Sequence, residues 1–182
     1  MSIHIDRTLY TGRPESGTRL SKELRTYDLL EELNIPFIRL DHDETGTIED
    51  CHEVDELLQI SICKNLFLCN AQKTKFYLLM LPGNKTFKTK DLSTQVNSAR
   101  LSFAPAEFME KYLDITPGSV SILGLMNDKD LQVQLIIDQD VIKEEYIGCH
   151  PCINTSSLKI KTKDILEKFL PYIQHNPVFV EL

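Results

Sequence analysis

The chain has 182 residues, of which 42% are hydrophobic and 26% charged, with a formal net charge of −7. This length suits one domain with its own core. The sequence contains no run of about 18 apolar residues, so we expect no transmembrane helix. The polar first residues do not resemble a signal peptide, so we expect a cytoplasmic protein whose cysteines stay reduced.

Charge is distributed unevenly along the chain. The range 71–100 is rich in lysine and arginine, whereas the range 41–56 is acidic and contains neither. One basic face could therefore attract phosphate groups on a protein that is acidic overall. The plainer alternative is a solvated surface rich in lysine.

The first elements follow an extended lead-in at residues 1–20, after which we expect one domain over residues 20–182. Ser21 is placed to cap a helix that runs to about Leu33, and Asn34 to end it in a left-handed conformation. Pro36 opens a strand at 37–40. A second helix is expected after Thr47, with Val54, Leu57 and Leu58 facing inward.

Two nearly continuous apolar runs, 66–69 and 76–81, predict paired central strands. Later elements are expected as a helix at 90–96, a strand at 101–103, a helix at 105–112, a strand at 131–138, a helix that Thr162 caps and that runs to about Gln174, and a strand at 178–180. The stretch "TPGSVSILGL" is typical of a loop. Helices and strands do not alternate regularly, so we expect an α/β (α+β) domain with a mixed central sheet and flanking helices.

The motif Cys149-His150-Pro151-Cys152 suggests a dithiol or half of a zinc site. A redox dithiol usually opens a helix, but the residues after Cys152 favour a strand. Zinc would need distant partners such as Cys63, Cys69 or His52, and no second Cys-x-x-Cys exists. Buried apolar thiols are the favoured interpretation.

Five stretches occur in an order that resembles a known family: "KNLFL" (64–68), "RLSFAP" (100–105), "PGSVS" (117–121), "LIID" (135–138) and "GCHPCINT" (148–155). Together they resemble the YbaK/ProX-type aminoacyl-tRNA deacylases, free-standing relatives of the editing domain of bacterial prolyl-tRNA synthetase, and in particular the ProX branch. The resemblance implies a single domain with a curved mixed sheet. It also implies hydrolysis of the ester between an amino acid and tRNA, without metal, cofactor or covalent enzyme nucleophile.

The resemblance assigns catalytic roles to Lys64 and His150. Lys64 would hold a phosphate or sugar oxygen of the tRNA 3′ end, and His150 would line the amino-acid pocket and limit its size. Gly148 would let the backbone approach the substrate. Gly118 and Ser119 would form another wall and offer amide donors to the developing oxyanion.

Three further positions match the family as substrate-binding residues. Thr47 and Asp138 would lie at the pocket edge, and Asn154 would brace its loop or touch the adenosine. Ile122 departs from the pattern, because many relatives have proline there. This difference leaves the identity of the amino acid less fixed than the reaction.

The resemblance therefore predicts a trans-editing hydrolase that removes alanine from proline tRNA. A synthetase pocket built for proline discriminates against a smaller amino acid by only about 1–3 kcal/mol per methylene, so a second site is needed. The expected partner is the acceptor end of proline tRNA, with prolyl-tRNA synthetase as a further candidate. The alternatives are a non-catalytic tRNA- or synthetase-binding module, and a thiol-redox or zinc protein.

Overall fold

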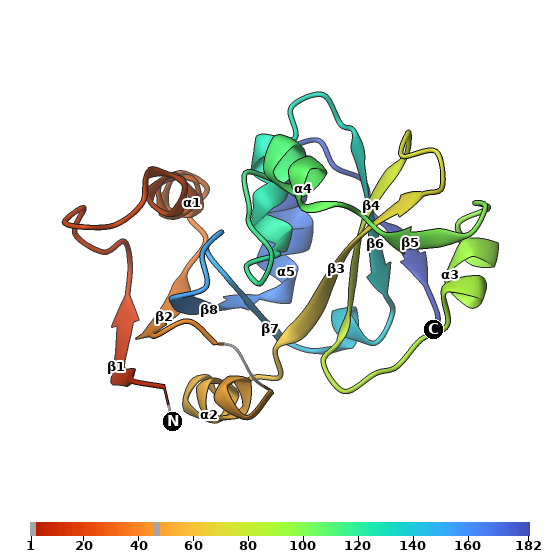
Figure 1. The fold of residues 1–182 in the computed structure, drawn as a ribbon. Helices are drawn as coiled ribbons and strands as arrows, with labels where there is room; N and C mark the ends of the chain where they lie inside the picture. The colour runs from red at the N-terminus through yellow and green to blue at the C-terminus, as the bar shows by residue number, and fades with distance from the viewer. Residues whose placement is uncertain (1–2, 46–47) are drawn as a thin grey trace.

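The computed structural model describes residues 3–45 and 48–182, whose strands form two sheets (Figure 1). The antiparallel four-stranded sheet has the order β1 (Ile5–Thr11), β2 (Phe37–His42), β8 (Ser156–Lys161), β7 (Tyr146–Cys149). The mixed five-stranded sheet has the order β5 (Leu101–Phe103), β3 (Cys63–Asn70), β4 (Phe76–Pro82), β6 (Val133–Asp138), β9 (Val178–Val180). The predicted mixed α+β class is confirmed, but the strands are divided between two sheets, and the lead-in contributes β1.

Short helices connect and cover these strands. They are α1 (Ser21–Glu32), α2 (Ile48–Leu58), α3 (Thr89–Gln95), α4 (Ala106–Leu113), the 3₁₀ helices η1 (Ile122–Asn127) and η2 (Val141–Lys143), and a last helix made of α5 (Thr162–Asp164), the π turn η3 (Ile165–Phe169) and α6 (Leu170–Tyr172). Figure 1 shows α2 beside the four-stranded sheet and α3 next to β5, near the C-terminus. Within the described ranges, every helix is too short or too polar to cross a membrane.

The two predicted N-terminal caps are wrong. Leu20 is the N-cap residue of α1 and makes no side-chain cap, so Ser21 is already helical. Thr162 instead donates its hydroxyl to the carbonyl oxygen of Glu144 at 2.6 Å, because α5 continues directly from β8 and has no loop to cap. Asn34 does adopt the predicted left-handed conformation, with φ of 52°.

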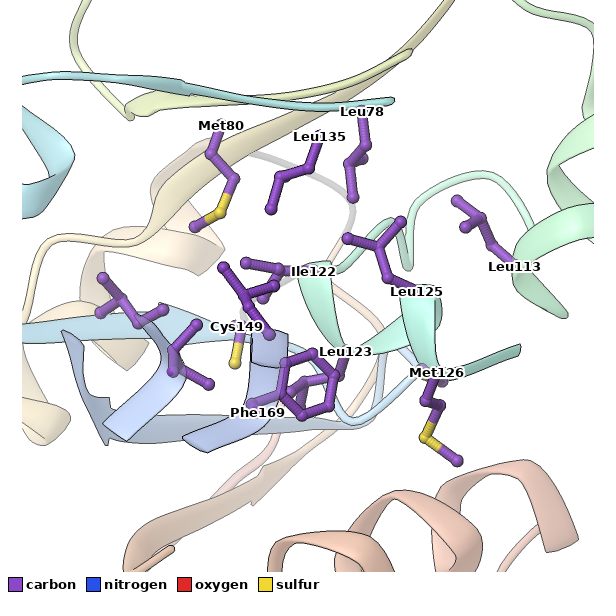
Figure 2. Packing of buried hydrophobic residues seen from close by; sticks show 14 of the residues in the cluster. Leu78, Met80, Leu113, Ile122, Leu123, Leu125, Met126, Leu135, Cys149 and Phe169 are labelled. Atoms are coloured by element: carbon purple, nitrogen blue, oxygen red, sulfur yellow. The ribbon is translucent and has the colours of Figure 1, made fainter. Parts of the chain in front are cut away.

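The Gly- and Ser-rich stretch expected to be a loop contains η1. The hydroxyl oxygen of Ser121 accepts a hydrogen bond from the Leu123 amide at 3.2 Å and caps this turn. Figure 2 shows Ile122 and Leu125 on the side of Leu78 in the five-stranded sheet. The residues of η1 therefore fill the main core between the two sheets.

A smaller core lies under α2. Val54 and Leu58 are buried against Leu40 of β2, and Leu57 is partly buried beside them. The inward face predicted for this helix is confirmed. The packing fixes α2 against the four-stranded sheet.

The two sheets meet where Gly148 of β7 forms a parallel bridge with Ile62, just before β3. A Cβ atom at Gly148 would lie 2.4 Å from Ile60 Cδ1 and 3.0 Å from Ile62 Cγ1. Since real Cβ contacts are longer, only glycine allows this approach without a shift. The bridge brings the start of β3 beside the end of β7.

Replacing Gly148 with alanine should lower the free energy of unfolding by about 1–3 kcal/mol, the usual cost of overpacking a core. Urea denaturation followed by circular dichroism measures this change.

Ile60 provides the matched control, because valine lacks the Cδ1 atom that the new methyl group would meet. The Gly148→Ala/Ile60→Val double variant should therefore lose less stability than the sum of the two single variants. Strict additivity would contradict the steric account.

Candidate functional site

A small cavity lies at the seam between the two sheets. Its volume is about 210 Å³, below the roughly 300–1,000 Å³ of sites for drug-sized ligands. It is lined by Ile62, Cys63, Asn65, Gly118, Val120, Cys149, His150 and Ser157. The cavity brings together two predicted site residues, Gly118 and His150, and Gly148 forms the bridge behind it.

His150 lies on the connection from β7 to β8. Its Nδ1 is 2.9 Å from the carbonyl oxygen of Ser156. A carbonyl only accepts, so Nδ1 carries the proton and Nε2 keeps a free lone pair. Burial lowers the pKa of His150 below 6.5, which keeps the ring neutral at pH 7.

A second histidine, which the sequence analysis did not single out, lies behind the cavity wall. His42 ends β2, and its Nε2 is 2.9 Å from the hydroxyl oxygen of Ser157 on β8. Its Nδ1 is 2.7 Å from the Asp43 carbonyl oxygen, and its ring centroid is 6.3 Å from that of His150. Burial also lowers the pKa of His42.

Gly118 shapes the opposite wall of the cavity. Its φ is +91°, which favours glycine, and a Cβ there would lie 3.4 Å from Nδ2 of Asn154. Asn154 accepts from the Thr45 hydroxyl at 2.6 Å and donates to the Thr45 carbonyl oxygen at 3.1 Å. These hydrogen bonds link the Asn154 loop to Thr45, as a bracing residue would, and both the bracing role and contact with adenosine stay predictions.

Ser119 faces a different cavity from Gly118. It lines, with Asn154, a polar cavity of about 470 Å³ on the side of α1. The Ser119 amide donates to the carbonyl oxygen of Thr116 at 3.1 Å. This amide is held within its own turn, which leaves it poorly placed as the oxyanion donor that the sequence suggested.

Lys64 and Asp138 are connected through a third residue, Lys85. The Lys64 ammonium donates to the Lys85 carbonyl oxygen at 2.9 Å. The Lys85 ammonium in turn donates to both carboxylate oxygens of Asp138 at 2.9 Å each. Asp138 is fully buried and also accepts from the Leu182 amide. Asp138 therefore holds the segment that follows β4. It does not line the small cavity, at whose edge the sequence placed it.

Lys64 is exposed and is flanked by two residues that line the cavity, Cys63 and Asn65. Alternate side chains of a strand face opposite sides, so Lys64 stands next to the cavity but outside its lining. Asn65 donates Nδ2 to the Cys63 carbonyl oxygen at 3.2 Å. Its Oδ1 is buried and has no hydrogen-bond partner among the described residues, so it offers a vacant acceptor.

The two cysteines of the Cys-x-x-Cys motif are buried free thiols. Burial raises the pKa of Cys152 to about 11, and it also raises the pKa of Cys149. The segment after Cys152 leads into β8, so no helix dipole activates a thiol. No cluster of three or more potential metal ligands was found in the ranges 3–45 and 48–182.

Two other predicted positions lie elsewhere. Thr47 falls outside the described residues. Ile122 is fully buried in the core between the sheets and does not line the small cavity. The departure from the family pattern at this position therefore changes core packing rather than the cavity wall.

The predicted basic face is divided between the two ends of β3. Lys73 and Lys75 lie in the turn after β3, and Arg100 precedes the β5 residue that pairs with Asn70. Lys85 follows β4 at the other end, beside Lys64. Only that second group lies near the small cavity.

The sequence profile described as "Aminoacyl-tRNA editing domain" matches residues 42–168. The chain belongs to the aminoacyl-tRNA editing domain family. The matched range includes β3, the PGSVS stretch and the His150 connection, which together enclose the small cavity.

Individual relatives of this editing domain agree with that assignment. The "Prolyl-tRNA editing protein ProX" of Acetoanaerobium sticklandii is 32% identical over 78% of this chain and 85% of its own length. The "Prolyl-tRNA synthetase associated domain-containing protein 1" of Danio rerio is 28% identical over 88% of this chain and 86% of its own. A solved structure provisionally described as a trans-editing enzyme for prolyl-tRNA synthetase has a TM-score of 0.64 at 12% identity, covering 90% of this chain and 99% of that one, and so shares the fold.

The two histidines should make stability fall in mild acid. Their pKa values are lowered in the folded state, so the unfolded chain binds protons first as the pH falls below about 6.5. Stability is therefore present above that pH and declines below it. Urea unfolding at about pH 7.5 and about pH 5.5 measures the decline.

The control is the His42→Gln/His150→Gln variant, which cannot titrate at either position. It should lose less stability over this pH interval than the unmodified protein. The same decline in both proteins would show that other groups cause it.

Proposed function

We propose that this protein hydrolyses alanyl-tRNA for proline as a free-standing editing enzyme. Membership of the aminoacyl-tRNA editing family supports ester hydrolysis. The names of the bacterial and vertebrate relatives support the proline system as its context.

The observation that carries this proposal is the small cavity at the seam of the sheets. Its apolar walls include Val120 and Cys149. Such walls suit a methyl side chain, because burying apolar surface is favourable. Its polar groups at Asn65, His150 and Ser157 suit the head of an amino acid. The cavity thus combines the two requirements for recognising a small amino acid.

Lys64 supplies the positive charge that the tRNA backbone needs at the cavity rim. Among the described residues its ammonium has one hydrogen-bond partner, the Lys85 carbonyl oxygen, so hydrogen-bond capacity remains for a phosphate or sugar oxygen. The buried Asp138 fixes Lys85 and thereby the position of that carbonyl. We infer that Asp138 acts as a positioning residue for Lys64.

A non-catalytic binding module is the main alternative. The same cavity and lysine could hold the acceptor end without cleaving it. We favour an enzyme over a binding module because the cavity is small and is lined by a neutral imidazole and a side-chain amide. A module that only binds tRNA would be expected to present a broad basic surface. Turnover measurements separate the two functions.

Alanyl-tRNA should be deacylated with multiple turnovers, whereas prolyl-tRNA for the same tRNA should be spared. The measurement follows loss of labelled amino acid from purified aminoacyl-tRNAs, with glycyl- and seryl-tRNA included to define the range. Rapid loss of prolyl-tRNA with alanyl-tRNA intact would reject the alanine specificity. Stoichiometric binding without turnover would favour the binding module.

Substitution of Lys64 with alanine should lower kcat/KM for alanyl-tRNA by about tenfold to a hundredfold, since hydrogen bonds to charged groups contribute about 1.5–3 kcal/mol. Lys73→Ala is the matched control, because it removes the same charge at the far end of the β3–β4 hairpin. It should change kcat/KM much less. Equal losses in both variants would indicate a diffuse charge effect and reject a local role for Lys64.

A further inference from the structure

The hydroxyl of Ser157 has a fixed orientation. The Asp43 carbonyl oxygen can only accept, so Nδ1 of His42 must carry the ring proton. Nε2 of His42 is then an acceptor at 2.9 Å from Ser157 Oγ. The Ser157 proton therefore points to His42, and its oxygen lone pairs stay available to the cavity that Ser157 lines.

Two other acceptors line the same cavity. Oδ1 of Asn65 is buried and has no partner among the described residues. Nε2 of His150 keeps its lone pair, because Nδ1 donates to the Ser156 carbonyl oxygen. The described side chains that line the cavity therefore offer three nitrogen or oxygen acceptors, Ser157, Asn65 and His150, a set that suits a ligand with several donors.

The charges around the cavity are also compatible with a positive ligand. None of the described residues that line the cavity is a lysine or arginine. The Asp55 carboxylate lies just behind the wall, where it accepts from the Ile62 amide at 3.3 Å. Burial, with this nearby carboxylate as a further cause, raises the pKa of the lining thiol Cys63 to about 12.

We propose that the cavity binds the α-ammonium group of the aminoacyl ester, with Ser157 as a direct acceptor and His42 as the residue that positions the Ser157 hydroxyl. This inference rests on the proposed function, because it names how the same site recognises its substrate. A primary ammonium has three N–H donors and matches the three acceptors. The acceptors are neutral, and hydrogen bonds to a charged donor are the stronger kind.

The same geometry contributes to rejecting proline. The nitrogen of a prolyl ester is a secondary ammonium with two N–H donors, so one cavity acceptor would lose its partner. Sites built to hydrogen-bond a group reject analogues that lack it, because a buried acceptor is left unpaired. Selection against proline then depends on the number of N–H donors on the substrate nitrogen as well as on the size of the amino acid.

The test compares two adenosine derivatives that resist hydrolysis, 3′-alanylamino-3′-deoxyadenosine and its propionyl counterpart, which lacks the ammonium. Titration calorimetry should show that the unmodified protein binds the alanyl derivative about tenfold to a hundredfold more tightly. Ser157→Ala should reduce that ratio severalfold by weakening only the alanyl derivative. Lysine side chains such as Lys64 serve both ligands equally and should not alter the ratio.

Ser156→Ala is the matched control. Ser156 precedes Ser157 on β8, and its hydroxyl donates to Asp41 at 2.6 Å on the opposite face of the strand. This variant removes only the hydroxyl and keeps the main-chain carbonyl oxygen that holds His150, so it should keep the unmodified ratio. His42→Gln, whose amide can still accept from Ser157, should retain part of the discrimination that His42→Phe loses, and circular dichroism checks that each variant is folded.

The outcomes separate this inference from the proposed function. Equal affinity for the two derivatives, a ratio unchanged by Ser157→Ala, or binding of neither derivative would overturn ammonium recognition, even if alanyl-tRNA is deacylated. A ratio that falls in Ser157→Ala, in a protein that deacylates no aminoacyl-tRNA, would support ammonium recognition and reject the proposed enzyme.

Discussion

The site depends on the close backbone approach between Gly148 and Ile62. That parallel bridge joins the end of β7 to the start of β3, and it leaves no room for a Cβ atom at Gly148. Because the bridge joins two separate sheets, side chains from both sheets can line the same small cavity. Asn65 comes from β3, and Ser157 comes from β8. The cavity is small because the two backbones are close.

The protein keeps two electrostatic environments next to each other. At the cavity, His150 in the wall and His42 behind it are held neutral by burial, and two backbone carbonyls fix their tautomers. Outside it, Lys64 provides positive charge, whereas Lys85 is paired with the carboxylates of Asp138 and Asp140. This separation would suit the proposed substrate, which combines the ammonium group of an aminoacyl ester with an anionic tRNA backbone. The net charge of −7 does not oppose that proposal, because phosphate contacts depend on local lysines and arginines.

Most elements could be predicted from the sequence, because apolar periodicity reflects burial. The hairpin of β3 and β4, the helix α2 and the strand β8 follow from it. The caps predicted at Ser21 and Thr162 are wrong, because α1 already includes Ser21 and the Thr162 hydroxyl donates to the distant Glu144 carbonyl oxygen. The 3₁₀ helix η1 was not predicted, because the stretch that leads into it is rich in glycine and serine, although the apolar side chains of η1 belong to the main core.

Only those residues of the site that belong to recognisable local stretches could be predicted from the sequence. Gly118 and His150 belong to recognisable stretches and meet at the cavity. The pair of His42 and Ser157 has no spacing signal, since their contact across 115 residues arises from the antiparallel register of β2 and β8. Local patterns cannot encode such a contact. Asn65 was visible beside Lys64, but its role became apparent only when its acceptor was found unpartnered inside the cavity.

The Cys-x-x-Cys motif is best explained by what it does for His150. Cys149 is the last residue of β7 and is buried in the core, and Cys152 is fully buried with a left-handed φ of 63° where the chain turns towards β8. Two small apolar side chains thus anchor both ends of a tight turn. His150 lies between these anchors and so has little freedom to move. The thiols contribute by packing, which holds the imidazole of His150 in the wall of the small cavity.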